Sequence, residues 1–390
     1  MGAVGLVMFL TFVGFSSSQF HGWLFQNRGV TKLDIGLLLM AGQAAAVISP
    51  FFQVSSIRLF GGPRIPFLLV LGGTGAGLAF LPHASGFWPL FACFTLFSFC
   101  AAGVFPLNAA NAFESLRAHG HGAFFRIRSL GTLGFLAGCV FSVCFPQVRD
   151  LPLLYAGFAG SLFLAMGVSA WGLRQRTEPA VGGPPSRPTF LHALKLLGQP
   201  RTLRLLAVLG AMNFANSMAT GVQGNYLVER WHQDQRVISL AWVVSTACEV
   251  PLMLFCAWLL RRRGLRAVLA FGIGGTFLKL AGLALAGEAW QYCLALALHG
   301  CFFSGALTGF SVWVDRVYKS QDRPSLQALA PIFYAGIPSA LSGLTAGLVW
   351  QNQSLRAVYL LAGAVSAAAA VYAFILLRDR EGTGGEAPIP

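Results

Sequence analysis

Long apolar stretches alternate with short polar ones along almost the whole chain. Each is long enough to cross the ~30 Å hydrocarbon core of a bilayer as a helix of ~20 residues. One hydrophilic stretch near the middle divides them six and six. The pattern predicts an all-α membrane protein with twelve transmembrane helices at 4–25, 34–56, 65–82, 87–112, 126–145, 151–173, 203–227, 237–260, 266–286, 289–314, 325–349 and 355–377.

The same pattern predicts the domain organisation. An N-terminal six-helix bundle would span 1–173, a cytoplasmic linker 174–202, a C-terminal six-helix bundle 203–377 and a polar cytoplasmic tail 378–390. The linker is rich in Pro, Gly and Arg, and a short interfacial helix is expected around Thr189–Leu197. Pro50 and Pro251 occupy the same helix of each half and precede basic loops, which indicates a duplicated unit. Such repeats are typical of secondary transporters, whose solute site lies near the membrane midplane.

Composition supports the membrane class. Of the 390 residues, 56% are hydrophobic and only 10% are charged, against about 25% in a typical soluble domain. The net charge of +14 does not indicate nucleic-acid binding, because most of the 27 Lys and Arg residues lie in short loops between apolar stretches. Their bias towards one set of loops predicts cytoplasmic N- and C-termini. No P-loop, dinucleotide-binding loop or HExxH motif is present, so we expect no enzyme activity, cofactor or metal.

Three ionisable residues lie inside predicted helices of the second half: Glu249, Lys279 and His299. An ionisable group at membrane depth is costly and needs a partner or a watery cavity. One interpretation is a proton-coupling site, in which the surroundings set the proton affinity of Glu249. The alternatives are a static Glu249–Lys279 ion pair that joins two helices, and a hydrogen-bonded packing role for His299.

Neutral amides form a second group of candidates. They could line a pocket for a polar solute, although each alone could equally make an interhelical hydrogen bond. His21 and Trp23 would be interfacial anchors at the outer end of the first helix. Glu114, Asp315 and Arg316 lie where two helices leave the membrane, where they could form gating salt bridges or solvated pairs of little energetic value. The amides are Gln19, Gln43, Asn108, Asn111, Asn213, Asn216, Gln223 and Asn225.

Three stretches resemble the major facilitator superfamily, in the branch of lactose permease, phenylpropionate permeases and nucleoside:proton symporters. They are TKLDIGLLLMAGQAAAVISPFF, FFRIRSLGTLGF at Phe124–Phe135, and CEVPLMLFCAWLLRRRGLRAVL followed by LHGCFF. The resemblance implies that Glu249, Lys279 and His299 form the coupling network and that Arg128 contacts the solute. Asn111 stands where the sugar permease of this branch has a carboxylate.

Together these features predict a proton-coupled symporter of the bacterial inner membrane that imports a small polar solute by alternating access. Nucleosides, sugars and aromatic acids are the candidate solutes, and protons and the lipid bilayer are the other expected partners of a monomeric protein. Arg128, Asn111, Gln19, Asn213, Asn216 and Gln223 are the predicted solute contacts. An efflux antiporter for amphipathic compounds and a non-transporting membrane receptor remain alternatives.

Overall fold

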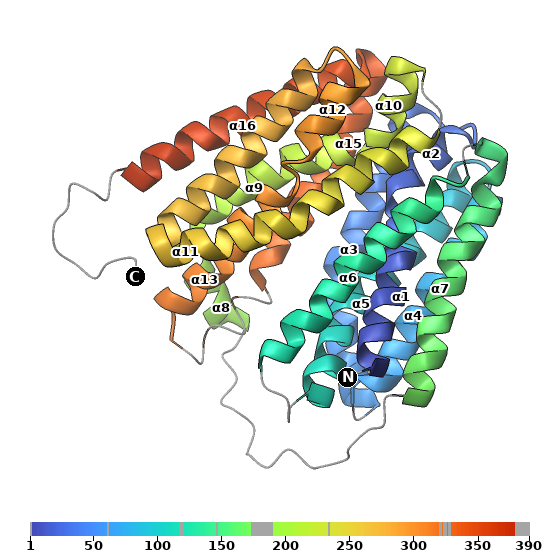
Figure 1. Ribbon diagram of the computed structural model, residues 1–390, viewed down its shortest axis with the longest axis horizontal. Helices are drawn as coiled ribbons and strands as arrows, with labels where there is room; N and C mark the ends of the chain where they lie inside the picture. Colours follow the sequence, from blue (N-terminus) through green and yellow to red (C-terminus); the bar gives the residue numbers. More distant parts are fainter. Residues whose placement is uncertain are drawn as a thin grey trace. The chain divides into compact units, whose positions relative to one another are not determined.

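The computed structural model describes residues 2–60, 62–116, 121–145, 147–172, 190–232, 235–319, 322, 326 and 329–378. Every regular element in this part of the chain is a helix, so the all-α prediction is confirmed (Figure 1). Contacts group the chain into two compact units. Unit 1 is Met1–Thr177, Gly221–Val243 and Gly343–Asn352, and unit 2 is Glu178–Thr220, Val244–Ser342 and Gln353–Pro390.

Unit 1 contains the helices of the first half of the chain, together with α10 from the second half. Helix α1 packs against α6 and α7, α3 packs against α5, and α4 packs against α5 and α7. The elements are α1 (Gly2–Phe15), η1 (Ser16–Phe20), α2 (His21–Gln26), α3 (Lys32–Leu59), α4 (Arg64–Phe80), η2 (Leu81–His83), α5 (Phe87–Leu116), α6 (His121–Ser142), η4 (Val148–Asp150), α7 (Leu151–Gly172) and α10 (Gln223–Trp231).

Glycines set the distance between α1 and α6. A Cβ atom on Gly134 would collide with the carbonyl of Phe9, and one on Gly131 would lie 3.0 Å from the ring of Phe12. Small residues let helix backbones approach closely, which is a major source of packing energy in membranes. These two glycines belong to the FFRIRSLGTLGF stretch, so part of that motif serves helix packing.

Unit 2 contains the linker helix and most of the second-half helices. They are α8 (Phe190–Leu197), α9 (Pro200–Gly221), most of α11 (Gln235–Leu285), α12 (Ala289–Leu296), the π-helix η5 (Phe302–Leu307), α13 (Thr308–Val317), the π-helix η6 (Ile332–Gly336), the first part of α15 (Ile337–Asn352), and α16 (Leu355–Arg378). Helix α8 confirms the short helix predicted in the linker.

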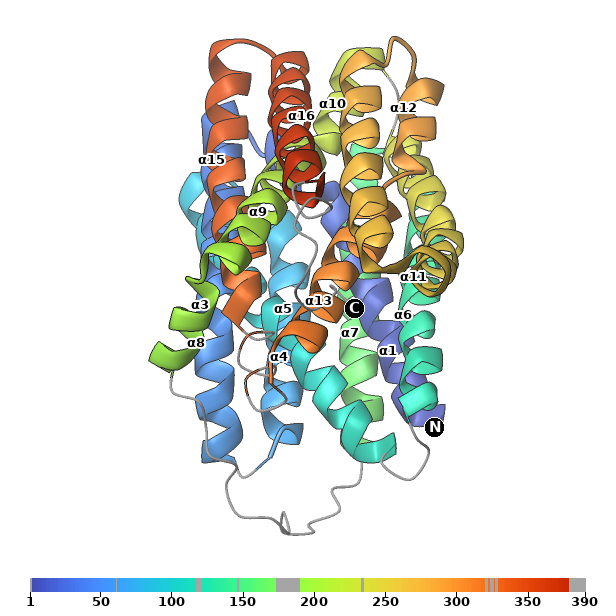
Figure 2. The ribbon, with the colours of Figure 1, turned by 90° about the vertical axis from the view of Figure 1, so that its left-hand side faces the viewer.

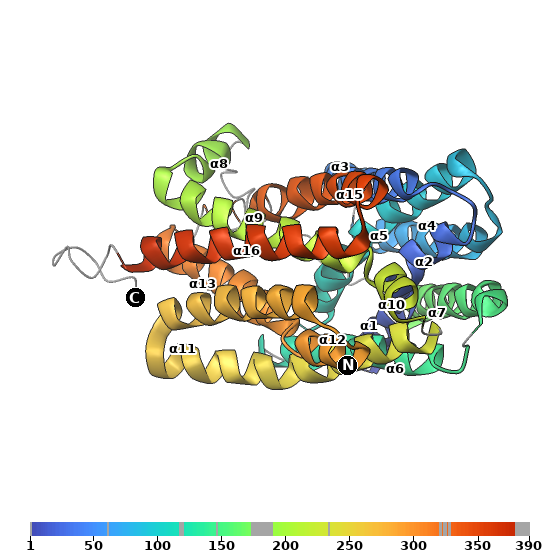
Figure 3. The same cartoon turned by 90° about the horizontal axis from the view of Figure 1, so that it is seen from above.

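Helix α11 is two predicted helices in one. Its backbone leaves the helical region at Gly264, where φ is 80° and ψ is −176°. A positive φ of this kind is readily adopted only by glycine. The chain folds back at this residue, so that α11 forms two limbs side by side (Figure 3). The limbs correspond to the predicted helices at 237–260 and 266–286.

The predicted spans 4–25, 203–227 and 289–314 are interrupted where the sequence predicted continuous helices. The 3-10 segment η1 separates α1 from α2, Val222 separates α9 from α10 at a 50° bend, and η5 follows a turn after α12. Eight helices in the described ranges are long and apolar enough to cross a membrane, or nine if the bent pair counts as one span. These elements are consistent with the twelve predicted spans.

Large apolar side chains cover much of the surface of these helices. Leu59, Trp171, Leu285 and Phe374 are among the many that are more than half exposed. Extensive exposed apolar surface on a protein marks a site of contact with a membrane or with another protein. On helices of this length it fits contact with lipid.

Candidate solute and proton site

The ammonium group of Lys279 lies inside unit 2 with no exposed surface. It donates hydrogen bonds to Oδ1 of Asn216 on α9 and to Nδ1 of His299, which is 3.2 Å away. Asn216 and His299 are themselves buried. The fold therefore joins three of the predicted site residues, from α9, the second limb of α11 and the turn after α12, into one network.

The bond to His299 defines the state of the imidazole ring. A protonated Lys279 can only donate, so Nδ1 must accept and the remaining proton of a neutral ring lies on Nε2. His299 sits in a turn between α12 and η5, and its ring packs 5.4 Å from that of Phe303. A π-helix within a span is often found at a functional site. Here it lies on the C-terminal side of His299.

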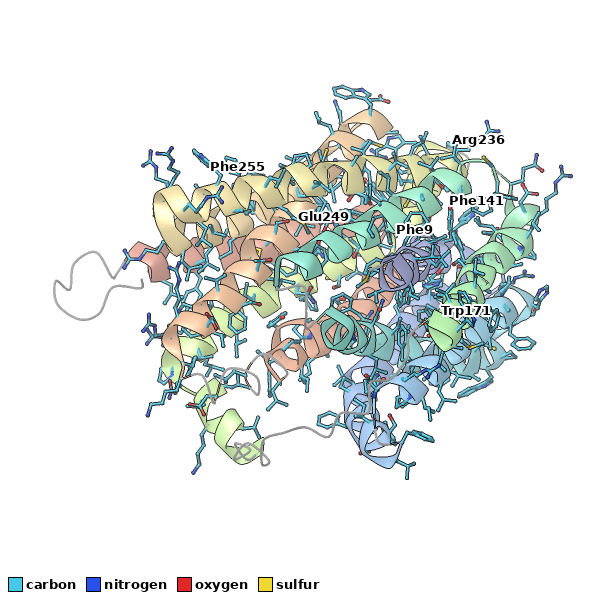
Figure 4. The ribbon with its side chains drawn as sticks, turned by 60° about the horizontal axis from the view of Figure 1, so that its bottom comes forward. Phe9, Phe141, Trp171, Arg236, Glu249 and Phe255 are labelled. Atoms are coloured by element: carbon cyan, nitrogen blue, oxygen red, sulfur yellow. The ribbon has the colours of Figure 1, made fainter. Side chains whose placement is uncertain are left out.

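Glu249 lies on the first limb of α11, between Arg236 and Phe255 along the helix (Figure 4). Its side chain is half-buried. A Cβ atom on Gly300 would lie 3.0 Å from Cα and 3.3 Å from Cγ of Glu249. Since Gly300 directly follows His299, the carboxylate-bearing arm packs against the turn that holds the imidazole. The partners of Lys279 are thus an amide and an imidazole, with Glu249 against the same turn.

A row of polar side chains on one face of α9 continues the network. Asn213, Asn216 and Ser217 are spaced to share that face. Asn213 donates to Oγ of Ser339 at 2.7 Å and to the carbonyl of Ala335 at 3.2 Å, and Ser217 bonds to the same hydroxyl at 2.9 Å. Ser339 was missed from the sequence, because a single serine in an apolar helix carries no distinguishing signal.

Gln19 and Gln223 lie in unit 1, each at an interruption of its helix. Gln19 is in η1 and donates to Oγ of Ser142 at 3.4 Å, while Gln223 begins α10. Gly224 packs close to the carbonyl of Gln19. Oε1 of Gln19 and both amide atoms of Gln223 are buried without a hydrogen-bond partner among the described residues. Unpaired buried amides are rare because they are costly, so they are functional candidates.

The predicted gating residues and the remaining predicted solute contacts lie on α5, α6 and α13. The side chains of Asn111, Glu114 and Arg128 lie outside the described residues, although their backbones belong to α5 and α6. Asp315 and Arg316 are exposed near the end of α13. The hydrogen bonds of the Lys279 network involve neither of these two residues.

His21 corrects a prediction. It was expected to be an interfacial anchor, but it is 6% exposed, and its ring centre lies 5.1 Å from that of Phe94 and 5.2 Å from that of Phe97. Tyr155 and Phe25 complete the aromatic surroundings. The cause is the 3-10 segment before α2, after which His21 faces α5 and α7 instead of the helix end.

Close contacts within unit 1 join helices from the two halves of the sequence. Asn225 on α10 donates to the carbonyl of Gly22 at 3.0 Å and to Oε1 of Gln26 at 2.7 Å. Helix α3 meets the last part of α15 backbone to backbone: a Cβ on Gly36 would lie 2.7 Å from both the Gly343 carbonyl oxygen and Cα of Gly347 (Figure 2). The contacts lie along α2, near the N-terminal ends of α3 and α10, and in the second half of α15.

Comparison with solved structures shows which fold the chain shares. The structure is similar to a point mutant of the nucleoside transporter NupG, with a TM-score of 0.84 at 16% identity over 96% of this chain and 99% of that one. It is also similar to a bacterial homologue of the human lysosomal transporter Spinster in an inward-facing, unoccupied conformation, with a TM-score of 0.73 at 12% identity over 99% and 98%. The chain therefore shares the fold of these two transporter structures.

The family itself is shown by sequence. The MFS_1 like family matches residues 3–361, nearly the whole chain. The protein belongs to this family, which confirms the major facilitator assignment, and it is an integral membrane transporter. No curated protein matches the sequence at a significant level.

Proposed function

We propose that the protein is a proton-coupled secondary transporter that imports a small polar solute by alternating access. The observation that carries the proposal is the network of Lys279, Asn216 and His299, with Glu249 packed against the same turn. A buried ionisable group is expensive at membrane depth and is a functional candidate for that reason. Glu249 is the proton-carrying group, and Lys279 and His299 couple its charge to the solute.

The solute contacts are the predicted amides together with Arg128. Asn213 and Asn216 lie next to Lys279 along α9. Gln19 and Gln223 keep buried amide atoms free for a ligand. Nucleosides, sugars and aromatic acids remain the candidate solutes, and similarity to NupG, described as a nucleoside transporter, supports testing nucleosides first. Glu114, Asp315 and Arg316 are the proposed gating residues, and Asn111 is a further solute contact.

We further propose a monomer in the bacterial inner membrane with both termini in the cytoplasm. The contacts between α3 and α15 and between α2 and α10 are then on the outer side and would break when that side opens. They are made by small residues and a few hydrogen bonds, which suits an interface that separates repeatedly.

Transport by the purified protein in proteoliposomes tests the proposal. The panel holds radiolabelled uridine, adenosine, lactose and phenylacetate, with an inward proton gradient imposed across the vesicle membrane. Accumulation above the external concentration that a protonophore abolishes is the expected result for at least one solute. Protein-free vesicles control for passive entry of weak acids. Uptake that only equilibrates, or proton-driven loss of solute from loaded vesicles, would contradict symport.

A further inference from the structure

An apolar groove of about 410 Å³ lies within unit 2, where the linker helix α8 meets the beginning of α9 (Figure 2). Leu194 and Leu197 of α8 form one side, and Leu203 and Leu206 of α9 form another. Phe333 of the π-helix η6 contributes to the lining as well. All ten lining residues are Leu, Ala, Gly, Phe or Pro. No lining side chain can therefore donate or accept a hydrogen bond, which suits a hydrocarbon chain and not a polar solute.

The groove opens onto the apolar surface of the helices. Leu203 is 56% exposed and Phe333 is 39% exposed, and Ala207 is exposed as well. The lining residues of α9 run from Leu203 to Ala211, a rise of about 12 Å at about 1.5 Å per residue. One leaflet contributes about 15 Å, half of the ~30 Å hydrocarbon core. The groove thus has the length of an acyl chain that enters from a single leaflet.

Two exposed cations border the groove. Lys195 directly follows the lining residue Leu194, and Arg204 directly follows the lining residue Leu203. Consecutive Cα atoms are about 3.8 Å apart, so both basic residues start from the rim of the groove. Long cationic side chains can cover apolar surface with their stems while the charge stays in the polar layer. The rim can therefore hold a negatively charged group next to an apolar chain.

A third cation lies at the same junction. The guanidinium of Arg201 is 5.7 Å from the ring centre of Trp313, and its Nε is buried without an acceptor among the described residues. No Asp or Glu occurs between Phe190 and Val228. Helix α13, which supplies Trp313, adds one charge of each sign through Asp315 and Arg316. The junction is thus positively charged, and clusters of this kind beside a membrane attract anionic headgroups.

We propose that the groove binds one acyl chain of an anionic phospholipid, whose phosphate lies at Lys195, Arg201 and Arg204. The apolar lining recognises the chain, and the three cations distinguish an anionic headgroup from a zwitterionic one. The bound lipid fastens the linker helix α8 to α9. This inference concerns a partner other than the transported solute and does not depend on proton coupling.

The lipid should stabilise unit 2, because the groove borders an important contact between helices. A Cβ atom on Gly210 would lie 3.4 Å from Cγ of Pro338, and both residues line the groove. Pro338 precedes Ser339, which accepts the hydrogen bond of Asn213 at 2.7 Å. A chain in the groove therefore adds packing beside the contact that joins α9 to α15.

Thermal unfolding of the purified, delipidated protein in detergent tests the proposal. The probes are dioleoylphosphatidylglycerol, dioleoylphosphatidylcholine, which has the same chains and no net charge, and glycerophosphoglycerol, which is the anionic headgroup without chains. Ligand binding raises the unfolding midpoint of a native state that it binds selectively. We expect a saturable increase with phosphatidylglycerol, and little change with phosphatidylcholine or with the headgroup alone.

Variants separate this groove from general contact with lipid. Ala207→Trp fills the groove and should abolish the response, whereas Ala368→Trp, at an exposed position on α16, should respond as wild type. Lys195→Gln and Arg204→Gln should each raise the half-saturating concentration of phosphatidylglycerol about fivefold, which corresponds to about 1 kcal/mol per cation near the membrane surface. Arg356→Gln, an exposed position on α16, is the matched control for lost charge and should leave the response unchanged.

Four results would overturn the inference. They are equal responses to phosphatidylglycerol and phosphatidylcholine, an equal response to the headgroup alone, no response to phosphatidylglycerol, and an undiminished response in Lys195→Gln and Arg204→Gln. Both of these variants change exposed side chains, so the test stays decisive even if Ala207→Trp does not fold. The first result would mean that the groove takes up any acyl chain, and the second that free phosphate compounds are bound instead of lipid.

Discussion

Lys279 donates a hydrogen bond to Nδ1 of His299, 3.2 Å away, although twenty residues separate them in the sequence. The bond joins the second limb of α11 to the turn between α12 and η5 and is buried at both ends. A hydrogen bond to a charged group contributes about 1.5–3 kcal/mol, and an unpaired buried charge costs more. This contact therefore stabilises the fold at the proposed coupling site and sets the tautomer of His299.

Two amide substitutions at His299 test which ring atom matters. In His299→Asn, Oδ1 takes the position of Nδ1 and can accept from Lys279, whereas the longer side chain of His299→Gln places its amide near the position of Nε2. We expect His299→Asn to keep a thermal unfolding midpoint close to that of wild type and His299→Gln to lower it by several degrees. Equal losses in the two variants would show that Nδ1 is not the atom that holds Lys279.

Ser339 should stabilise the polar row of α9. Its hydroxyl is 2.7 Å from the Asn213 amide and 2.9 Å from the Ser217 hydroxyl. Ser339→Ala should lower the free energy of unfolding by about 0.6 kcal/mol, the average for a hydrogen bond between transmembrane helices, and by no more than about 1.7 kcal/mol, the largest such value. The matched control is Ser311→Ala: its exposed hydroxyl donates to the carbonyl of Leu307, four residues earlier, and its loss should change little. Chemical or thermal unfolding of both variants in detergent measures the difference.

No side chain larger than that of glycine should fit at position 36 while α3 and α15 are in contact. The atoms that a Cβ there would meet at 2.7 Å belong to the backbones of Gly343 and Gly347, which cannot rotate away. We expect Gly36→Val to separate the helices and lower the unfolding midpoint, because overpacking typically costs about 1–3 kcal/mol.

Gly160→Val is the control for this substitution, since it places the same residue on helix α7 where no atom of the described residues lies within 4 Å of a Cβ. Both variants carry the same helix-propensity cost, so their difference isolates the contact. An unfolding midpoint of Gly36→Val equal to that of Gly160→Val would contradict the close approach of α3 and α15.

The helical architecture was predictable because the length and apolar character of each stretch are enough to indicate a membrane-spanning helix. The interruptions inside the helices could not be predicted from the sequence. Ser16 bonds to the carbonyl of Val13, which is one way serine competes with helical hydrogen bonding, but three serines in an apolar run gave no reason to expect a 3-10 segment there. His21 was misplaced for the same reason, since its burial depends on how α2 continues after that segment.

The candidate site was predictable as a set of residues but not as a network. Ionisable residues in apolar stretches stand out by their cost, so Glu249, Lys279 and His299 could be recognised. Charge attraction suggested a Glu249–Lys279 pair, whereas the hydrogen bonds of Lys279 go to Asn216 and His299. Which partners Lys279 bonds to depends on the face of α9 that packs against α11. Packing between helices far apart in the sequence decides that face.

Solute accumulation by Glu249→Gln tests the central claim most directly. The variant cannot carry a proton at this position, but it keeps the shape of the side chain. We expect it to lose accumulation against a concentration gradient while it retains exchange of internal for external solute at a rate comparable to wild type. Accumulation equal to that of wild type under the same imposed proton gradient would contradict the assignment of Glu249 as the proton-carrying group.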